Sequence, residues 1–475
     1  MSRELSPHVD RLLPADPGVR ELARRLYDAV AAAPILSPHG HVDAALLADD
    51  KPFPDPATLL ITPDHYVLRL LHAVGVPLDA LGRGAAPADP QEVWRAFCAN
   101  WDVFLGTPVR YWFETSLSEV FGVTEQPSAG NADELYAHID SQLRTAEFHP
   151  RALFERFRIA VLATTDDPAD DLAAHARLRD DPSFHGHVLP TFRADRYMDP
   201  SAAGWTIAIA ELSEAAGTDA GNYAGLLEAL RRRRAAFRAA GGTATDTGVL
   251  DAGSQPLTSA DAERIHAAGL RSEVTAEDAT AYRRNMLYRL AEMSSEDGLV
   301  MQLHPGVIRN HHRDTLARFG PDSGHDLPDV AAFTRPLTPI LNDFGTNETF
   351  RMVLFTVDET AFSREIGPLA GFYPSVYAGA PWWFLDTPDA ISRYRRSVTD
   401  SAGFTKTSGF VDDTRAFCSI PARHDMSRRL DAGYLAALVS EHRLTEEQAF
   451  ALAHRFVDDI PRTTFRLPGG TASAS

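Results

Sequence analysis

The chain has 475 residues, 44% of them hydrophobic, and carries a formal charge of −19 at pH 7. Nucleic acid and anionic membranes bind basic patches, so this charge argues against both as partners. Only Cys98 and Cys418 are present, no apolar run reaches membrane-spanning length, and the first residues show no basic segment followed by an apolar one. The sequence therefore predicts a cytoplasmic protein without a disulfide framework, built as a large barrel with insertions or as two domains.

The amino-terminal part of the chain changes from a helical to an extended pattern. Apolar residues at three-to-four spacing predict a helix that ends near Val30. An apolar run then stops at Ser37, and His39 and His41 follow with only Gly40 between them. Residues 44–155 are helical in pattern, and their aromatic residues recur at the spacing typical of a core. A helical segment of this length between two strands predicts an insertion.

After residue 155 the chain alternates between short apolar runs and helix-length segments. The runs that we interpret as strands are 159–165, 187–192, 244–246, 299–303, 352–356, 375–378 and 409–411. With the strand before His39 they make eight, which predicts an α/β fold, a (β/α)₈ TIM-type barrel with a large helical insertion after the first strand. The predicted division is 1–43 for the first helix and strand, 44–155 for the insertion, 156–467 for the rest of the barrel and 468–475 for a loose tail.

Polar side chains follow these apolar runs, where barrels of this type place their chemistry. His39, His41, His304 and Asp413 would therefore surround one mouth. Alternate residues of an extended chain share a face, so His39 and His41 point the same way. Two imidazoles and a carboxylate suit a single divalent metal ion with one open position. Arg309 and Arg415 lie close by in sequence, and their planar guanidinium groups predict an acidic substrate.

Each of these features also has a structural interpretation. A histidine pair separated by one residue is common in surface turns, and His304 is compatible with a core histidine whose nitrogens are satisfied. Asp413 and Arg415 alternate as a structural ion pair at a strand end would. Their joint occurrence at predicted strand ends favours a functional site.

Short motifs along most of the chain occur in an order that is known from one family. They are His39-Gly40-His41, Asp64-His65-Tyr66 with Arg69, Gly106-Thr107-Pro108 with Tyr111-Trp112, Thr164-Thr165-Asp166-Asp167-Pro168, Met301-Gln302-Leu303-His304 with Gly306 and Arg309, Trp382-Trp383-Phe384, Asp413-Thr414-Arg415-Ala416-Phe417, and Arg423-His424. With these motifs the chain resembles the uronate isomerases, also called the glucuronate isomerase family, which are the sugar-acid isomerase branch of the amidohydrolase superfamily.

The resemblance implies an aldose–ketose isomerase that acts on a small anionic sugar acid. The expected reaction interconverts D-glucuronate with D-fructuronate, or D-galacturonate with D-tagaturonate. The resemblance also implies that His39, His41 and Asp413 hold one divalent ion, expected to be zinc, and that Asp413 moves the proton between C2 and C1 through an enediol. Tyr66 would assist opening of the pyranose ring. The residues expected to contact the substrate are His65, His304, Arg309, Trp382, Trp383 and Arg415, of which His304 and Arg415 also count as catalytic.

Lysine usage argues for one metal ion instead of two. Dinuclear hydrolases of the superfamily usually bridge two metals with a carboxylated lysine after the fourth strand. The only lysines here are Lys51, in the helical segment, and Lys406, just before the last strand. Neither position can supply that bridge.

The chain also departs from the family pattern. A His-Gly-Cys-x-x-Ser-Asp-His-Gly run usually follows the fourth strand, and here Asp246 is kept while Gly241 and Thr247 replace the two histidines. Ser37 stands where an aspartate often opens the His-x-His motif. These departures predict an altered pocket.

The alternatives to a uronate isomerase are a mononuclear metal-dependent hydrolase of the same barrel class, acting on a lactone or amide, and a sugar-acid binder without turnover. A homo-oligomer is compatible with the sequence.

Overall fold

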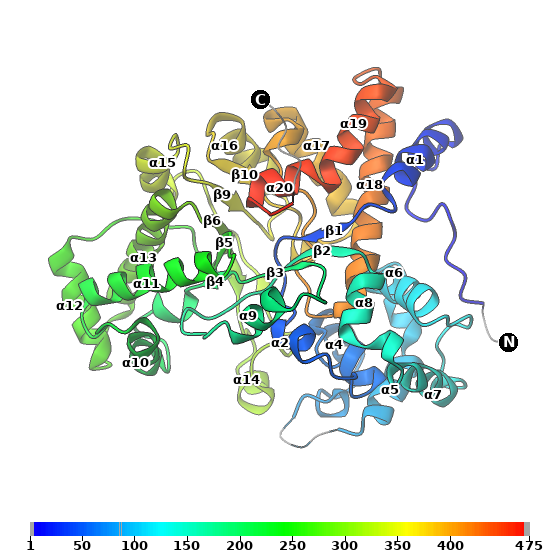
Figure 1. Ribbon diagram of the computed structural model, residues 1–475, viewed down its shortest axis with the longest axis horizontal. Helices are drawn as coiled ribbons and strands as arrows, with labels where there is room; N and C mark the ends of the chain where they lie inside the picture. Colours follow the sequence, from blue (N-terminus) through cyan, green and yellow to red (C-terminus); the bar gives the residue numbers. More distant parts are fainter. Residues whose placement is uncertain (1–3, 85, 87, 470–475) are drawn as a thin grey trace.

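The computed structural model describes residues 4–84, 86 and 88–469, and residues 470–475 of the predicted tail lie outside them. Parallel strands form two arcs at the centre of the molecule (Figure 1). The first arc has the order β1-β2-β3 and the second the order β10-β9-β6-β5-β4. Their bounds are β1 Ile35–Ser37, β2 Ile159–Ala163, β3 His187–Leu189, β4 Phe192–Arg193, β5 Ala244–Val249, β6 Val300–Pro305, β9 Met352–Leu354 and β10 Val376–Ala378.

The arcs meet on one side where the predicted third strand is divided. Pro190 has no N–H to donate to a neighbouring strand, and it separates β3 from β4. Phe192 pairs in parallel with Asp166, which follows β2, and the Arg193 N–H donates to the Asp166 carbonyl at 3.0 Å. The third barrel position is therefore filled by two short strands instead of one.

On the other side, residues 407–414 connect the two arcs. Thr407 pairs in parallel with Ala378 at the end of β10, and the His41 N–H donates to the Thr414 carbonyl at 3.0 Å. The prediction of a strand over 409–411 is wrong, because the described structure has none there. Gly409 and Asp413 have φ angles of 74° and 40°, which interrupt an extended conformation. The eighth position of the TIM-type barrel is thus an irregular segment.

Helices build the chain between β1 and β2. Their bounds are α2 Ala44–Asp49, α3 Pro56–Leu60, α4 His65–Ala73, α5 Pro90–Ala99, α6 Pro108–Thr115, α7 Ala132–Leu143 and α8 Pro150–Arg156. The aromatic residues Trp94, Phe97, Phe104 and Trp112 are buried in one hydrophobic cluster, as their helical spacing predicted. The helical part of the chain therefore has a hydrophobic core that it shares with the start of β1 and β2.

The remaining helices surround the strands (Figure 1). They are α1 Pro17–Val30, α9 Ala173–Asp180, α10 Trp205–Ala216, α11 Tyr223–Ala239, α12 Ser259–Leu270, α13 Ala276–Asp297, α14 Arg313–Phe319, α15 Thr338–Phe344, α16 Gly367–Phe372, α17 Pro388–Ala402, α18 Ile420–Ser440, α19 Glu446–Val457 and α20 Asp459–Phe465. A small antiparallel pair, β7 Val307–Ile308 and β8 Leu327–Pro328, follows β6. The predicted first helix is confirmed as α1, which Asp16 caps by accepting hydrogen bonds from the Gly18 and Val19 N–H groups.

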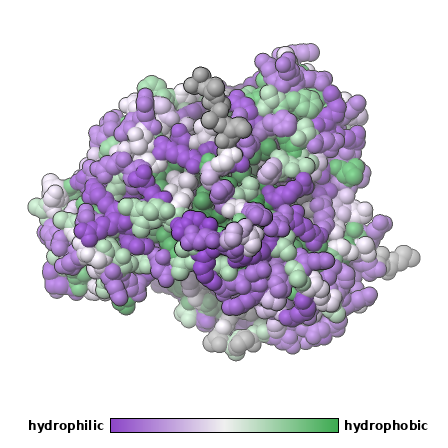
Figure 2. All heavy atoms as spheres, in the orientation of Figure 1, coloured by the Kyte–Doolittle hydropathy of each residue, from purple (hydrophilic) through white to green (hydrophobic). Residues whose placement is uncertain are grey.

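The surface shown in Figure 2 is mostly hydrophilic, with hydrophobic residues in small groups between polar ones. In the part of the chain that the structure describes, no helix combines the length and the apolar character needed to cross a bilayer.

Candidate active site

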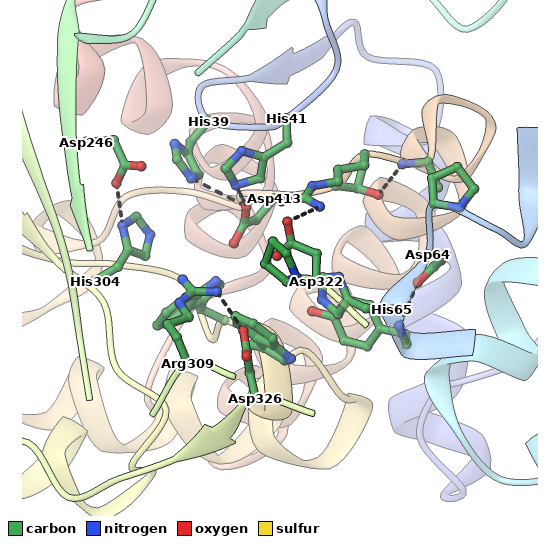
Figure 3. A pocket seen from close by; sticks show the side chains of 18 of the residues that line it. His39, His41, Asp64, His65, Asp246, His304, Arg309, Asp322, Asp326 and Asp413 are labelled. Atoms are coloured by element: carbon green, nitrogen blue, oxygen red, sulfur yellow. Dashed lines mark hydrogen bonds and ion pairs between the residues drawn. The ribbon is translucent and has the colours of Figure 1, made fainter. Parts of the chain in front are cut away.

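A cavity of about 350 Å³ brings the predicted residues together (Figure 3). It lies at the carboxyl ends of the strands, since His39 follows β1 and His304 belongs to the end of β6. Every residue that the sequence singled out as a ligand or catalytic group lines it: His39, His41, His65, Tyr66, His304, Arg309, Trp382, Trp383, Asp413 and Arg415. The roles of these residues stay predictions.

Asp413 lies between the two histidines of the His-x-His motif. Its Oδ1 atom is 2.9 Å from His41 Nε2 and 3.4 Å from His39 Nε2. His39 is only 1% exposed, so the interpretation of the motif as a surface turn is wrong for this residue. The φ angle of 40° at Asp413 is a strained conformation for a residue with a side chain, and such strain is concentrated at functional sites.

The charge state of Asp413 follows from these contacts. Burial opposes ionisation, but hydrogen bonds from His39 and His41 outweigh it and hold the pKa of the Asp413 carboxyl well below its usual value. Asp413 is therefore an ionised carboxylate at neutral pH. It can accept a proton or bind a cation.

His304 is oriented by a chain of two charged groups for which no role was predicted. Its Nδ1 atom is 2.8 Å from Asp246 Oδ1, and Arg193 Nη1 is 3.3 Å from Asp246 Oδ2. Burial lowers the pKa of His304, so its ring is neutral, while Arg193 and His304 hold the pKa of Asp246 below its usual value in spite of burial. The ionised carboxylate only accepts hydrogen bonds, so Nδ1 is the donor and Nε2 carries the lone pair. The ring also stacks on Phe355, with the centroids 4.1 Å apart. His304 thus presents an unprotonated nitrogen in the cavity wall.

His39, His304 and Asp413 form the group best placed to hold a metal ion. Each offers one ligand atom, and these atoms all lie within 4.8 Å of one another. His304 Nε2 is buried and has no hydrogen-bond partner among the described residues. An unpaired buried acceptor of this kind fits a set of ligands, and the geometry adds His304 to the predicted set of His39, His41 and Asp413.

The start of α4 places two aromatic side chains in the cavity. Asp64 caps this helix by accepting a hydrogen bond from the Tyr66 N–H at 2.8 Å. The rings of His65 and Tyr66 stack with their centroids 4.9 Å apart, and His65 also lies 4.8 Å from Trp383. Burial raises the pKa of the Tyr66 phenol well above its usual value, so its hydroxyl keeps its proton and acts as a donor.

Two arginines at the mouth pair with aspartates of one loop. Arg415 Nη1 is 3.0 Å from Asp322 Oδ2, and Arg309 Nη1 is 3.1 Å from Asp326 Oδ2. The structural pair of Asp413 with Arg415 that the sequence also allowed is thus not formed. Both arginine side chains are about two-fifths exposed, at 39% for Arg415 and 41% for Arg309. They remain accessible to an anionic substrate.

Several residues of the cavity received no predicted role. Arg193 and Asp246 lie at the ends of predicted strands, and Arg423 belongs to one of the family motifs. Their positions in the sequence could therefore have predicted that they line the cavity. Asp322 and Asp326 lie in a loop without periodicity, and nothing in the sequence pointed to them.

The departures from the family pattern lie outside the cavity. Gly241 has a φ angle of 97°, a conformation that favours glycine, and Thr247 is buried on β5 next to Asp246. Neither residue lines the cavity. Lys51 and Lys406 do not line it either.

Comparison with known proteins agrees with this geometry. The family described as Glucuronate isomerase matches residues 18–463. A uronate isomerase of Corynebacterium efficiens is 48% identical over 98% of this chain and 100% of its own length. The crystal structure of glucuronate isomerase from Caulobacter crescentus has a TM-score of 0.96 and 42% identity, covering 100% of this chain and 99% of that one. The crystal structure of uronate isomerase from Thermotoga maritima has a TM-score of 0.91 and 27% identity, covering 97% and 99%. The resemblance is thereby confirmed, and the chain belongs to the glucuronate isomerase family.

Proposed function

We propose that this chain interconverts the aldose and ketose forms of a hexuronate, either D-glucuronate with D-fructuronate or D-galacturonate with D-tagaturonate. The observation that carries the proposal is an ionised, strained carboxylate, Asp413, in a cavity whose mouth holds Arg309 and Arg415. The carboxylate can transfer a proton, Arg309 can bind the acid group of the sugar, and Arg415 can face the oxygens of C1 and C2. Membership of the family favours an isomerase over the hydrolase that the sequence left as an alternative.

The reaction needs two proton movements. The C2–H bond of the open-chain aldehyde breaks and a C1–H bond forms, while the hydroxyl proton moves from O2 to O1. Asp413 takes the proton from C2 and returns it to C1 on the same face of the enediol. Arg415 stabilises the charge that develops on the oxygens. Tyr66 donates its phenol proton to the ring oxygen as the bond between C1 and that oxygen breaks, and the anomeric hydroxyl proton, released as C1 becomes an aldehyde, restores the phenol.

A divalent metal ion, for which we propose zinc, would be held by His39, Asp413 and one or both of His41 and His304. The donor set supports this, since imidazole nitrogens and a carboxylate suit Zn²⁺ and His304 Nε2 is unpaired among the described residues. When bound, the ion would supply Lewis-acid stabilisation of the sugar oxygens. Asp246 and Arg193 hold the His304 ring in the orientation that this requires.

The direct test is to incubate the protein separately with D-glucuronate, D-galacturonate and simple lactones. Formation of a ketose from one of the uronates supports the proposal. Release of acid from a lactone without any ketose from either uronate would support the hydrolase instead.

Removal of the Arg415 guanidinium should lower turnover strongly. In Arg415→Ala the group that faces the developing oxygen charge is lost, and the loss of one such donor typically lowers kcat by about 10²–10³-fold. Steady-state kinetics with the preferred uronate measure the effect. Arg318→Ala, a change on the surface helix α14, is the control and should leave kcat unchanged. Near-normal kinetics for Arg415→Ala would exclude this residue from the reaction.

Metal analysis of the purified protein should find about one ion per chain. The ligand set is a single cluster and neither lysine lines the cavity, so the usual bridge for a second ion is missing. His39→Asn should lose the ion, whereas His187→Asn, an exposed change at the start of β3, should retain it. Two ions per chain would contradict the mononuclear site.

A further inference from the structure

A second cavity, of about 370 Å³, lies at the opposite end of the strands. Ile35 at the start of β1 and Arg158 just before β2 line it, together with Ala31 after α1 and residues of α18. In Figure 1, α6, α8 and α18 lie next to these strand starts. Because the active-site cavity follows the carboxyl ends of the strands, a five-residue strand such as β2 separates the two by about 15 Å.

Three guanidinium groups line this second cavity, from Arg156, Arg158 and Arg428. Their hydrogen bonds go to backbone carbonyls: Arg156 donates to Glu119 and Val120, Arg158 to Ala32, and Arg428 to Ala31 and Pro34. Within the described residues none of the three forms an ion pair. Carbonyls satisfy hydrogen bonds but do not neutralise charge, so the lining keeps three cations without a carboxylate of their own.

Arg428 is the least compensated of the three. It is only 7% exposed, and its Nε atom is buried without a hydrogen-bond partner among the described residues. Burial lowers the pKa of its guanidinium to about 10, although the nearby Asp425 carboxylate of the same lining acts in the opposite direction. A second buried group of the lining, the Thr115 hydroxyl, also lacks a partner there, although Thr115 is only 4% exposed. Buried donors are normally paired, so these two indicate a missing acceptor.

The carboxylates of the same lining are already engaged. Asp425 Oδ2 is 2.9 Å from Arg429 Nε and 3.1 Å from Arg11 Nη2, and it also accepts a hydrogen bond from the Tyr111 hydroxyl. Glu119 is 58% exposed and pairs with Arg11 at 2.9 Å. The direct ion pairs of these acids are therefore with Arg11 and Arg429, and Asp425 acts on Arg428 only through space.

We propose that this second cavity is a binding site for a small anion, such as a phosphorylated or polycarboxylated metabolite. Arg158 and Arg428 supply the charge, Arg156 adds to it, and the Thr115 hydroxyl and Arg428 Nε supply donors for the ligand oxygens. The planar guanidinium group donates paired hydrogen bonds that match the oxygens of a phosphate or a carboxylate. A ligand that carries one of these groups would therefore fit the arginines of the cavity. At about 370 Å³ the cavity is similar in volume to the active-site cavity, so it accommodates more than a single oxyanion.

Equilibrium dialysis of the full chain tests this site with two labelled probes, inorganic phosphate and malonate. Each probe is measured with and without a saturating hexuronate, which occupies the active-site cavity and separates binding there from binding at the second cavity. The variants are Arg158→Gln, Arg428→Gln and Thr115→Val. Arg179→Gln is the matched control, since this exposed arginine pairs with Asp180 and lines neither cavity.

We expect about one phosphate or malonate per chain that hexuronate does not displace, with affinity at least tenfold weaker in Arg158→Gln and Arg428→Gln and unchanged in Arg179→Gln. The probe that binds more tightly identifies a phosphorylated or a carboxylated ligand. Absence of binding by both probes, complete displacement by hexuronate, or unchanged affinity in Arg158→Gln would overturn the proposal. Arg158 is exposed, so its variant decides the question even if Arg428→Gln does not fold. The result is independent of isomerase activity.

Discussion

Asp413→Asn is expected to lower kcat for the preferred uronate by about 10²–10⁴-fold, the range typical of a lost general base. Asparagine keeps the size of the side chain but cannot accept the proton from C2. Steady-state measurement of ketose formation reports the effect. Asp322→Asn is the control at the same mouth, because it changes a partner of Arg415 without removing the proposed proton carrier. Its kcat should fall by less than tenfold.

Asp413 is proposed both as proton carrier and as metal ligand, and the metal content of Asp413→Asn separates the two roles. If the variant retains the ion and still binds uronate, the lost activity belongs to proton transfer. If the ion is lost, the fall in kcat combines the loss of the metal with the loss of the proton carrier. A variant that turns over uronate at the normal rate would exclude Asp413 from the mechanism. A native protein that binds uronate without converting it would instead be the non-catalytic binder.

Arg395→Met is expected to destabilise the fold by about 3–5 kcal/mol, the usual result of breaking a buried ion pair. Arg395 on α17 forms two hydrogen bonds with Asp431 on α18, at 2.6 and 2.7 Å, and both side chains are less than one-tenth exposed. Removal of the arginine leaves Asp431 charged and buried. The shift of the thermal unfolding midpoint against the native chain measures the loss.

Two further variants show whether the unpaired charge is the cause. Arg395→Met combined with Asp431→Leu should recover most of the stability, because no buried charge then remains. Arg95→Met removes an exposed arginine that pairs with Glu92 and Asp133, and it should change the midpoint little. If Arg395→Met and the double variant lose the same amount of stability, the cause is lost packing instead of an unpaired charge. The contact of Arg395 with Phe456 contributes to that packing.

The sequence by itself determined the elements and the position of the chemistry. Apolar periodicity is local, so it predicted α1, the helices between β1 and β2, and most of the strands. Polar residues directly after those strands had to meet at one end of a parallel barrel, which is why His39, His304 and Asp413 were found together. The irregular segment at 409–411 was missed, since its φ angles depend on contacts with β10 and with the loop that carries His41.

Only the tertiary structure decided which charges pair. Asp246 lies 58 residues from His304, and the pair forms across the neighbouring strands β5 and β6. Arg415 pairs with Asp322, which lies in a loop whose sequence has no periodic pattern. The arginines of the second cavity likewise come from the chain before β2 and from α18, and no local pattern connects them. The free energy of a charge depends on burial and on its neighbours in space, and neither quantity is encoded in the residues adjacent along the chain.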